Sequence, residues 1–265
     1  MTIEMERMDT LRTTLIQTEL HWEDIAANLD MFDEKIENYA SESHLIVLPE
    51  MFSTGFTMNA EALAEGMNGS AVTWLRNKAA SRKCHITGSV IIREQECYFN
   101  RLIWATPEGG LHQYDKRHLF RYAGEEKVYH AGDQHLTIEL NGWKIRPFIC
   151  YDLRFPLWTR NFDNSYDVAI FIANWPEKRA SHWKALLKAR AIENQSYVIA
   201  VNRIGEDGNG FYYSGDSVII DPTGKNLFHA AHTPCIHTAH LPYEHVAACR
   251  NTFPVWKDAD RELVK

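Results

Sequence analysis

The chain has 265 residues, of which 45% are apolar and 24% are charged, so it can bury a sizeable core and is not expected to be disordered. Its formal net charge of -7 argues against a nucleic-acid-binding protein, because such proteins present a basic surface. No segment approaches the roughly 20 consecutive apolar residues of a membrane-spanning helix, which argues against a membrane protein.

Strands and helices are predicted to alternate along the whole chain. Helices are predicted where apolar residues recur with helical spacing, as Ile25, Leu29, Phe32 and Ile36 do. Strands are predicted where short runs are apolar or rich in β-branched residues. In chain order, the predicted elements are strand 11–20, helix 22–39, strand 44–48, helix 70–82, strands 85–93, 98–106, 144–150 and 167–173, helix 181–195, strand 197–202 and helix 243–250.

Turn and capping residues mark several boundaries between these elements. Ser70 is a plausible N-cap for the second helix. Turns are predicted at residues 95–96, 107–110 and 221–224, where the last closes a late hairpin, and residues 205–210 are predicted to form a loop. The alternation indicates an α/β fold with a mixed sheet.

The chain contains no evident linker, low-complexity segment or clean internal repeat, so it is predicted to form one domain. Its five cysteines include no Cys-x-x-Cys pair, which predicts neither a disulfide framework nor a zinc site. A cytoplasmic location fits this cysteine usage and an N-terminal segment that lacks the apolar stretch of a secretory signal.

Cys150 ends a predicted apolar strand and is followed at once by a turn that contains Asp152 and Arg154. A strand that delivers a thiol into a polar turn commonly presents a nucleophile, whereas a structural cysteine more often has apolar neighbours on both sides. On this pattern alone, a structural role for the cysteine stays open.

Two more charged residues follow predicted strands. Glu50 comes directly after the apolar run at 44–48, and Pro49 stops the strand there. A carboxylate at such a place is partly desolvated, which raises its pKa toward that of a general base; the alternative is an ordinary polar loop residue. Lys116 follows a hairpin strand. It is either a solvated surface charge or a fixed cation that stabilises an oxyanion and a nearby thiolate.

A base, a cation and a thiol form a set that suits attack on an amide-like carbon. The sequence has no Gly-x-Gly-x-x-Gly motif, no Walker loop and no His-Glu-x-x-His pattern. His118, His182 and His237 are each expected to be core or surface residues and not metal ligands.

The three segments, in this order and spacing, resemble the nitrilase superfamily of carbon–nitrogen hydrolases. Glu50 lies in Leu-Pro-Glu-Met-Phe, Lys116 in Tyr-Asp-Lys-Arg-His-Leu-Phe and Cys150 in Ile-Cys-Tyr-Asp-Leu-Arg-Phe-Pro. The resemblance implies that these residues are the family's catalytic glutamate, lysine and cysteine. It also implies an α-β-β-α sandwich, here as a single carbon–nitrogen hydrolase domain over residues 1–265 with its core at about 11–253.

The resemblance further implies a second glutamate in the loop after the lysine. The distance to the Gly-Asp pair at residues 132–133 favours Glu125, and the adjacent Glu126 is the alternative. This glutamate would hold Lys116 in place and assist proton handling. The family chemistry needs neither a cofactor nor a metal.

Other segments are similar to the omega-amidase branch of the superfamily: residues 51–58, the Asn-Trp-Pro sequence at 174–176 and the run 182–195. Omega-amidases hydrolyse the terminal amide of 2-oxo dicarboxylate monoamides such as 2-oxoglutaramate and 2-oxosuccinamate. The alternatives are another amidase of this superfamily, acting on neutral aliphatic amides or N-carbamoyl compounds, and a non-catalytic binding protein that retains the fold.

The implied cycle begins when Glu50 accepts the thiol proton of Cys150 and the thiolate attacks the amide carbon. The Lys116 ammonium and the backbone N–H of Tyr151 would stabilise the oxyanion. Ammonia leaves, and water activated by Glu50 releases the product from the thioester on Cys150.

Because the substrate carries a carboxylate, we expect a cation in the pocket. Arg154 is the candidate, because its planar fork can bind a carboxylate through two hydrogen bonds; the alternative is a salt bridge to Asp152 or a contact with a helix end. Phe56 and Trp175 are predicted to wall the pocket, although aromatic residues after strands often serve packing alone. Related enzymes commonly form dimers through the face that holds the cysteine strand, which predicts a homodimer.

Overall fold

The computed structural model describes residues 7–38 and 42–260. Its strands are β1 (Thr10–Gln17), β2 (Leu45–Val47), β3 (His85–Glu94), β4 (Cys97–Ala105), β5 (Leu111–Asp115), β6 (Ile138–Leu140), β7 (Trp143–Ile149), β8 (Val168–Ala173), β9 (Tyr197–Asn202), β10 (Ile204–Glu206), β11 (Tyr212–Ile220), β12 (Asn226–Ala231) and β13 (Cys235–Pro242). Its α-helices are α1 (Ile25–Asn38), α2 (Ala60–Leu63), α3 (Ser70–Arg82), α4 (Pro156–Thr159), α5 (Ala180–Asn194) and α6 (Tyr243–Thr252). The 3₁₀ helices near the site are η1 (Arg121–Ala123), η2 (Glu125–Lys127), η3 (Cys150–Arg154) and η5 (Glu177–Arg179).

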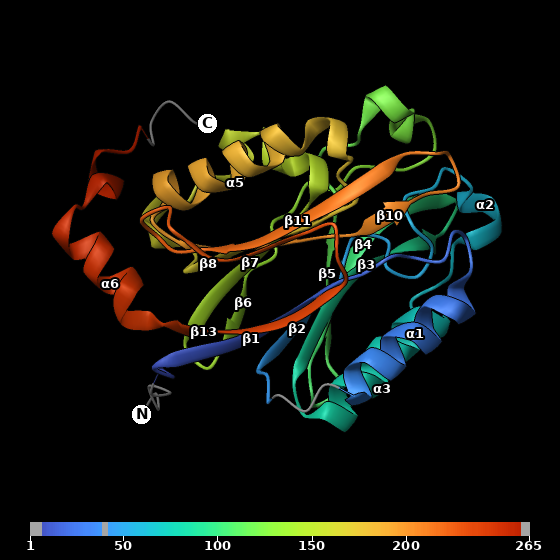
Figure 1. Cartoon of the computed structure of the whole chain (residues 1–265), viewed down its shortest axis with the longest axis horizontal. Helices are drawn as coiled ribbons and strands as arrows, with labels where there is room; N and C mark the ends of the chain where they lie inside the picture. The colour runs from blue at the N-terminus through green and yellow to red at the C-terminus, as the bar shows by residue number, and fades with distance from the viewer. Residues whose placement is uncertain (1–6, 39–41, 261–265) are drawn as a thin grey trace.

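The strands form two mixed sheets stacked face to face (Figure 1). The first sheet has the order β13-β1-β2-β3-β4-β5, and the second has the order β10-β11-β9-β8-β7-β6 with β12 paired to β11. In each sheet three central strands run parallel, β1 to β3 in the first and β7 to β9 in the second. Helices α1 and α3 cover the outer face of the first sheet and α5 that of the second. The fold is therefore the predicted α-β-β-α sandwich, with two mixed sheets in place of one.

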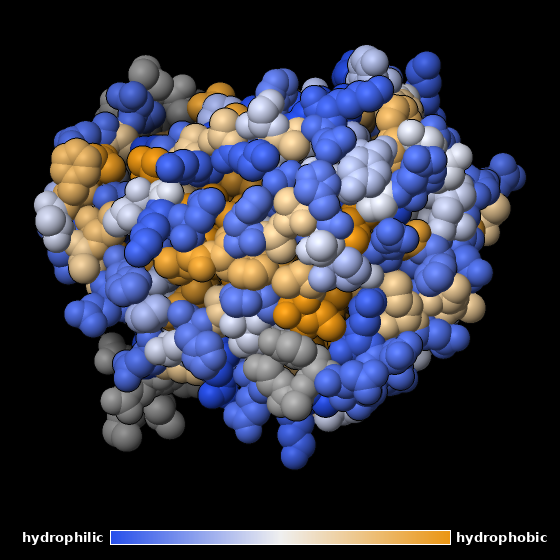
Figure 2. All heavy atoms as spheres, in the orientation of Figure 1, coloured by the Kyte–Doolittle hydropathy of each residue, from blue (hydrophilic) through white to orange (hydrophobic). Residues whose placement is uncertain are grey.

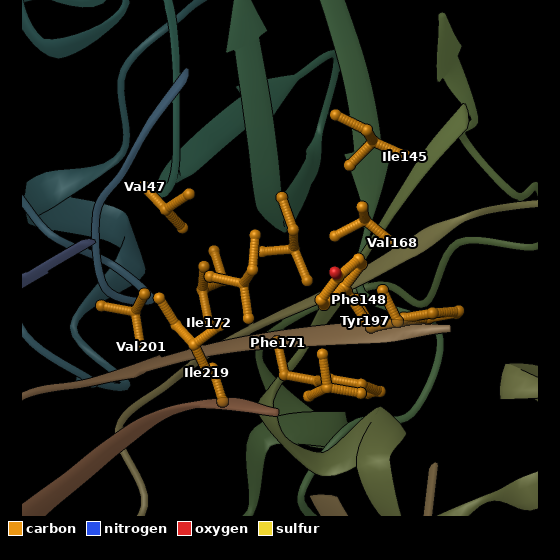
Figure 3. Close-up of a cluster of buried hydrophobic side chains, with 14 of the residues drawn as sticks. Val47, Ile145, Phe148, Val168, Phe171, Ile172, Tyr197, Val201 and Ile219 are labelled. Atoms are coloured by element: carbon orange, nitrogen blue, oxygen red, sulfur yellow. The ribbon is translucent and has the colours of Figure 1, made fainter. Parts of the chain in front are cut away.

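Successive side chains of a strand point to opposite faces of the sheet, so the first sheet packs against the second sheet on one face and against helices on the other. In β2, Leu45 and Val47 belong to the core between the sheets, while Ile46 packs with residues of α1 and α3. In Figure 3, Val47 lies in one buried cluster with side chains of the second sheet, such as Phe148 and Ile172. Both faces of β8 and β9 are buried, which accounts for their unbroken apolar sequences.

The distribution of apolar side chains on the surface agrees with the layered arrangement. Figure 2 shows apolar side chains across the middle of one face, between α5 and the pair α1 and α3, where the layers of the sandwich are seen from the side. No helix in residues 7–38 or 42–260 is long and apolar enough to cross a membrane.

The predicted element boundaries were mostly close, and the differences have local causes. Helix α1 begins at Ile25 and not at residue 22, because Glu23 has a left-handed backbone (φ +55°) and the Asp24 side chain accepts the N–H of Ala27 at 3.0 Å. The predicted helix end at Tyr39 lies outside the described residues. Strand β10 occupies part of the predicted loop at 205–210.

Besides β11 and β12, which were predicted only through their hairpin turn, the strands β5, β6, β10 and β13 were not predicted with bounds because their signals are weak. Strand β6 has three residues, and β5 was noted only as the strand before Lys116. Strand β13 carries half-exposed polar residues and gains its conformation by pairing along its whole length with β1.

The predicted N-cap at Ser70 was wrong. Gly69 occupies the N-cap position of α3, and Ser70 is the first helical residue. The Glu65 carboxylate caps the helix from outside it, since it accepts the N–H of Ala71 at 3.1 Å and that of Val72 at 2.9 Å. Its negative charge also lies at the positive end of the helix dipole.

We expect Glu65→Ala to lower the free energy of unfolding by about 1–2 kcal/mol, the usual cost of losing a helix cap. Urea denaturation followed by circular dichroism measures the loss. Glu61→Ala, an exposed position of α2, is the control and should change stability by less than about 0.5 kcal/mol. Equal effects of the two substitutions would contradict the capping role of Glu65.

Candidate active site

Glu50, Lys116 and Cys150 follow three strands from both sheets: β2 and β5 of the first sheet and β7 of the second. The Lys116 ammonium lies 2.8 Å from Glu50 Oε1. Lys116 and Cys150 border the same cavity, and the charges of Glu50 and Lys116 both act on the Cys150 thiol. Residues that are far apart in the sequence thus meet where the two sheets end.

Lys116 is fully buried between two fully buried carboxylates. Its Nζ lies 3.0 Å from both carboxylate oxygens of Glu125 and 2.8 Å from Glu50. Burial alone would lower the pKa of Lys116, but the charges of Glu125 and Glu50 raise it above its ordinary value, so the ammonium stays charged. Burial raises the pKa of Glu125, against the opposing effect of Lys116. In the described part of the chain, the alternative residue Glu126 makes no hydrogen bond to Lys116.

Two asparagines complete the surroundings of Glu50. Asn100 donates its side-chain amide to Glu50 Oε1 at 2.9 Å, and the backbone N–H of Asn174 donates to Oε2 at 2.8 Å. The Asn174 side chain also donates to the backbone carbonyl of Glu50 at 2.6 Å. Both carboxylate oxygens are therefore held in place. Asn100 was missed in the sequence, where its one signal is a polar residue next to Arg101 in the middle of strand β4.

The nucleophile candidate sits at a sharp turn. Cys150 has a left-handed backbone (φ +43°), which is uncommon for a residue other than glycine. The buried Asp152 carboxylate holds this turn, since it accepts the N–H of Ile149 at 3.0 Å and the hydroxyl of Tyr114 at 2.6 Å. It also accepts the N–H of His118 at 2.9 Å. These contacts fix the direction in which the thiol points.

The surroundings of the Cys150 thiol favour its protonated form. Burial raises its pKa well above the ordinary value, and the negative charge of Glu50 raises it further, while Lys116 acts in the opposite direction. A buried, protonated thiol is a weak nucleophile, so it needs a base at the moment of attack. Glu50 is the carboxylate whose charge acts most strongly on it.

A cavity of about 570 Å³ opens onto Cys150. The residues predicted to contact substrate all border it: Phe56, Tyr151, Arg154 and Trp175. The Phe56 ring centre lies 5.1 Å from Lys116 Nζ, so this ring covers the ammonium. Arg154 lies with its guanidinium carbon 4.7 Å from the Trp175 ring centre, and its Nη2 lies 3.2 Å from Nδ1 of His182. The salt bridge to Asp152 that was the alternative for Arg154 does not occur between these described residues.

Of the three histidines considered in the sequence, two pack on aromatic rings, and the third, His182, is exposed beside Arg154. His118 stacks on Phe155 with ring centres 3.7 Å apart, and His237 stacks likewise on Phe228. Across residues 7–38 and 42–260, no group of three or more His, Cys, Asp and Glu side chains is arranged to hold a metal ion.

Residues 12–251 match the family described as carbon–nitrogen hydrolase, so the chain belongs to this family of hydrolases. It is 46% identical to the omega-amidase YafV of Escherichia coli strain K12, over 96% of this chain and 98% of that protein. It is 34% identical to the 2-oxoglutaramate amidase of Bacillus subtilis strain 168, over 94% of this chain and 97% of that protein.

Solved structures give the same relationship. XC1258 from Xanthomonas campestris, described as a CN-hydrolase superfamily protein with an arsenic adduct in the active site, has a TM-score of 0.92 and 45% identity, over 96% of this chain and 98% of that chain. Nit3 of Saccharomyces cerevisiae, of the nitrilase superfamily, shares the fold with a TM-score of 0.84 at 24% identity, over 93% and 95% of the two chains.

We expect Lys116→Met to destabilise the protein by about 3–5 kcal/mol at pH 8, because two buried carboxylates lose their counter-charge. The loss should shrink toward pH 5. The pKa of Glu125 is raised even beside Lys116 and rises further without it, so the folded state holds a proton that the unfolded state releases. The free energy of unfolding therefore falls as pH rises from the unfolded pKa through the folded pKa.

Urea denaturation at several pH values between 5 and 8 tests this expectation. Lys127→Met removes an exposed lysine from η2 and is the control, with an expected change below about 0.5 kcal/mol at every pH. A loss for Lys116→Met that does not depend on pH would contradict the account of the buried charges.

Proposed function

We propose that the protein is an omega-amidase that hydrolyses the terminal amide of 2-oxo dicarboxylate monoamides, such as 2-oxoglutaramate, to the 2-oxo diacid and ammonia. The observation that carries the proposal is the meeting of Glu50, Lys116 and Cys150 beside a cavity that also contains Arg154. The relatives named omega-amidase and 2-oxoglutaramate amidase support it over nearly their whole length.

In the first half of the reaction, Glu50 takes the proton from Cys150 Sγ as the sulfur attacks the amide carbon. The carbonyl oxygen becomes an oxyanion beside the Lys116 ammonium and the backbone N–H of Tyr151. Glu50 then gives its proton to the amide nitrogen. The carbon–nitrogen bond breaks, ammonia leaves and a thioester remains on Cys150.

In the second half, a water molecule enters the place that ammonia vacated. Glu50 takes a proton from this water as its oxygen attacks the thioester carbon. When the oxyanion collapses, the carbon–sulfur bond breaks and the proton on Glu50 returns to the Cys150 sulfur. Glu125 keeps Lys116 at the oxyanion through both halves, at 3.0 Å from the ammonium.

The charges around the cavity favour an anionic substrate without an ammonium group. Three cations border the cavity and have no carboxylate partner among the described residues: Arg154, Lys178 and Arg179. They outnumber the two carboxylates there, Glu23 and Asp207, which hydrogen bonds of the protein hold in place. Glu23 accepts a hydrogen bond from Asn59 at 3.1 Å. Asp207 accepts one from the Tyr213 hydroxyl at 2.8 Å. Because Arg154 has no carboxylate partner among the described residues, a 2-oxo acid fits this cavity better than glutamine, whose ammonium would meet the arginine.

We also propose that the protein is a single-domain cytoplasmic homodimer that binds neither nucleic acid nor membranes. The five cysteines, all free thiols, support a reducing compartment, and the net charge of -7 argues against nucleic acid. Large apolar side chains stand exposed on the helices beside the cysteine strand, with Leu157 of α4 69% exposed and Ile192 of α5 48% exposed. Burial of these side chains between two copies of the chain would stabilise the proposed dimer.

We expect the purified protein to release ammonia from 2-oxoglutaramate and 2-oxosuccinamate, and far more slowly from glutamine, propionamide and carbamoylated amines. Cys150→Ala should lose activity by several orders of magnitude while its circular dichroism spectrum stays native, because only the nucleophile is removed. The control Cys235→Ala removes a thiol from β13 and should retain full activity.

The same panel separates the alternatives. Faster turnover of propionamide or of carbamoylated amines would replace the omega-amidase assignment with another amidase activity. Activity of Cys150→Ala near that of the unchanged protein would eliminate the thioester mechanism.

The proposed dimer predicts that Ile192→Glu shifts the protein from dimer to monomer in analytical ultracentrifugation, because a charge would be buried at the interface. Ala26→Glu, at an exposed position of α1 on the opposite outer face of the sandwich, should leave the sedimentation coefficient unchanged. A monomeric unsubstituted protein would refute the dimer directly.

A further inference from the structure

A second arginine, Arg179, borders the cavity that contains Cys150. It ends the 3₁₀ helix η5, which follows strand β8. Its guanidinium carbon lies 5.2 Å from the ring centre of Phe120 and 5.9 Å from that of Tyr122. A guanidinium over aromatic faces keeps its N–H edge free for hydrogen bonds to an anion.

The backbone of Arg179 is tied to the active site. Trp175 Nε1 donates to the Arg179 carbonyl at 2.7 Å. The Trp175 backbone N–H donates in turn to Asn202 Oδ1 at 2.8 Å, and Asn202 Nδ2 returns a bond to the Trp175 carbonyl at 3.0 Å. Asn174, the residue before Trp175, holds Glu50. Arg179 is thus positioned by the same strand end that positions the general base.

Arg154 and Arg179 share one aromatic frame. The Arg154 guanidinium carbon lies 4.7 Å from the Trp175 ring centre and 5.9 Å from that of Tyr151. The Tyr151 ring lies 5.0 Å from the ring of Phe120, on which Arg179 lies. The contacting rings of Tyr151 and Phe120 therefore link the two arginines, and both arginines border the same cavity.

Within the described residues, neither guanidinium forms an ion pair with Asp or Glu. Burial lowers the pKa of Arg154, and the positive charge of Arg179 lowers it further, so the two cations repel each other. Two like charges held close in a partly buried cavity are stabilised when an anion binds between them. This arrangement indicates a site for a carboxylate that the protein itself does not supply.

We propose that Arg179 is a second carboxylate-binding residue, which binds the 2-oxo acid end of the substrate together with Arg154. The inference rests on the proposed omega-amidase function and names the residue that sets its preference for anionic amides. A 2-oxo acid end offers three oxygen acceptors, two on the carboxylate and one on the adjacent carbonyl. One guanidinium fork binds two of them, and the second supplies the remaining donors.

The first test measures kcat and KM for 2-oxoglutaramate with Arg179→Ala and Arg179→Lys. We expect Arg179→Ala to raise KM at least about tenfold, because a charge-assisted hydrogen bond to the ground state is lost, with a smaller change in kcat. Arg179→Lys should recover only part of the loss, since it restores the charge without the fork. An unchanged KM would overturn the proposal.

The second test does not depend on turnover. Isothermal titration calorimetry measures the binding of 2-oxoglutaramate, and of the neutral amide pentanamide, to Cys150→Ala with and without Arg179→Ala. The affinity for 2-oxoglutaramate should fall at least about tenfold and that for pentanamide less than twofold. Equal losses for the two ligands would mean that Arg179 only supports the fold.

Arg121→Ala is the matched control. Arg121 is an exposed arginine of η1, next to Tyr122, and is not among the described residues that line the cavity. If Arg121→Ala weakens binding as much as Arg179→Ala, the general positive potential and not a direct contact attracts the substrate, and the proposal fails. If the unsubstituted protein does not hydrolyse 2-oxoglutaramate, the omega-amidase function fails. If it does, and substitution of Arg179 changes neither KM nor affinity, only the role of Arg179 fails.

Discussion

The burial of one ammonium between two carboxylates constrains this molecule more than any other interaction. Removing such groups from water costs several kcal/mol for each ion, and the cost is recovered only when every partner is in place. Lys116 lies 2.8–3.0 Å from Glu50 and Glu125, and Asn100 and the backbone of Asn174 supply the remaining donors to Glu50. The ends of β2, β5 and β8 and the helix η2 are therefore fixed relative to one another by a single buried cluster.

The same cluster explains why a protonated thiol suits the proposed chemistry. The negative charge starts on Glu50, moves to the Cys150 sulfur and then to the oxyanion, while the total charge around Lys116 stays constant. Because the ammonium is fixed and shielded from water, little reorganisation is needed as the charge moves. A permanent thiolate would add a negative charge to a buried group of two carboxylates and one ammonium, which burial and Glu50 disfavour.

The sequence predicted the parts of this structure that depend on local pattern. Periodic apolar residues located most helices and strands, and the segments around Glu50, Lys116 and Cys150 marked the site because each follows a strand. It could not predict contacts made between distant segments. Nothing in the sequence places Asn100 of β4 beside Glu50, and the cap of α3 comes from Glu65 because the preceding loop folds back. Strand β13 owes its conformation to β1, more than 200 residues earlier.

The end of β8 connects the chemistry to the choice of substrate. Asn174 holds Glu50 through its backbone and its side chain, and the next residue, Trp175, contacts Arg154 and binds the backbone of Arg179. Two consecutive residues thus set the separation between the general base and the arginines. In the proposed reaction, a substrate is placed for attack when its carboxylate reaches the arginines while its amide carbon lies at Cys150, and the rate depends steeply on that placement. Under this proposal, the arginines select substrates by charge, and residues 174 and 175 hold these arginines at a fixed place relative to Glu50.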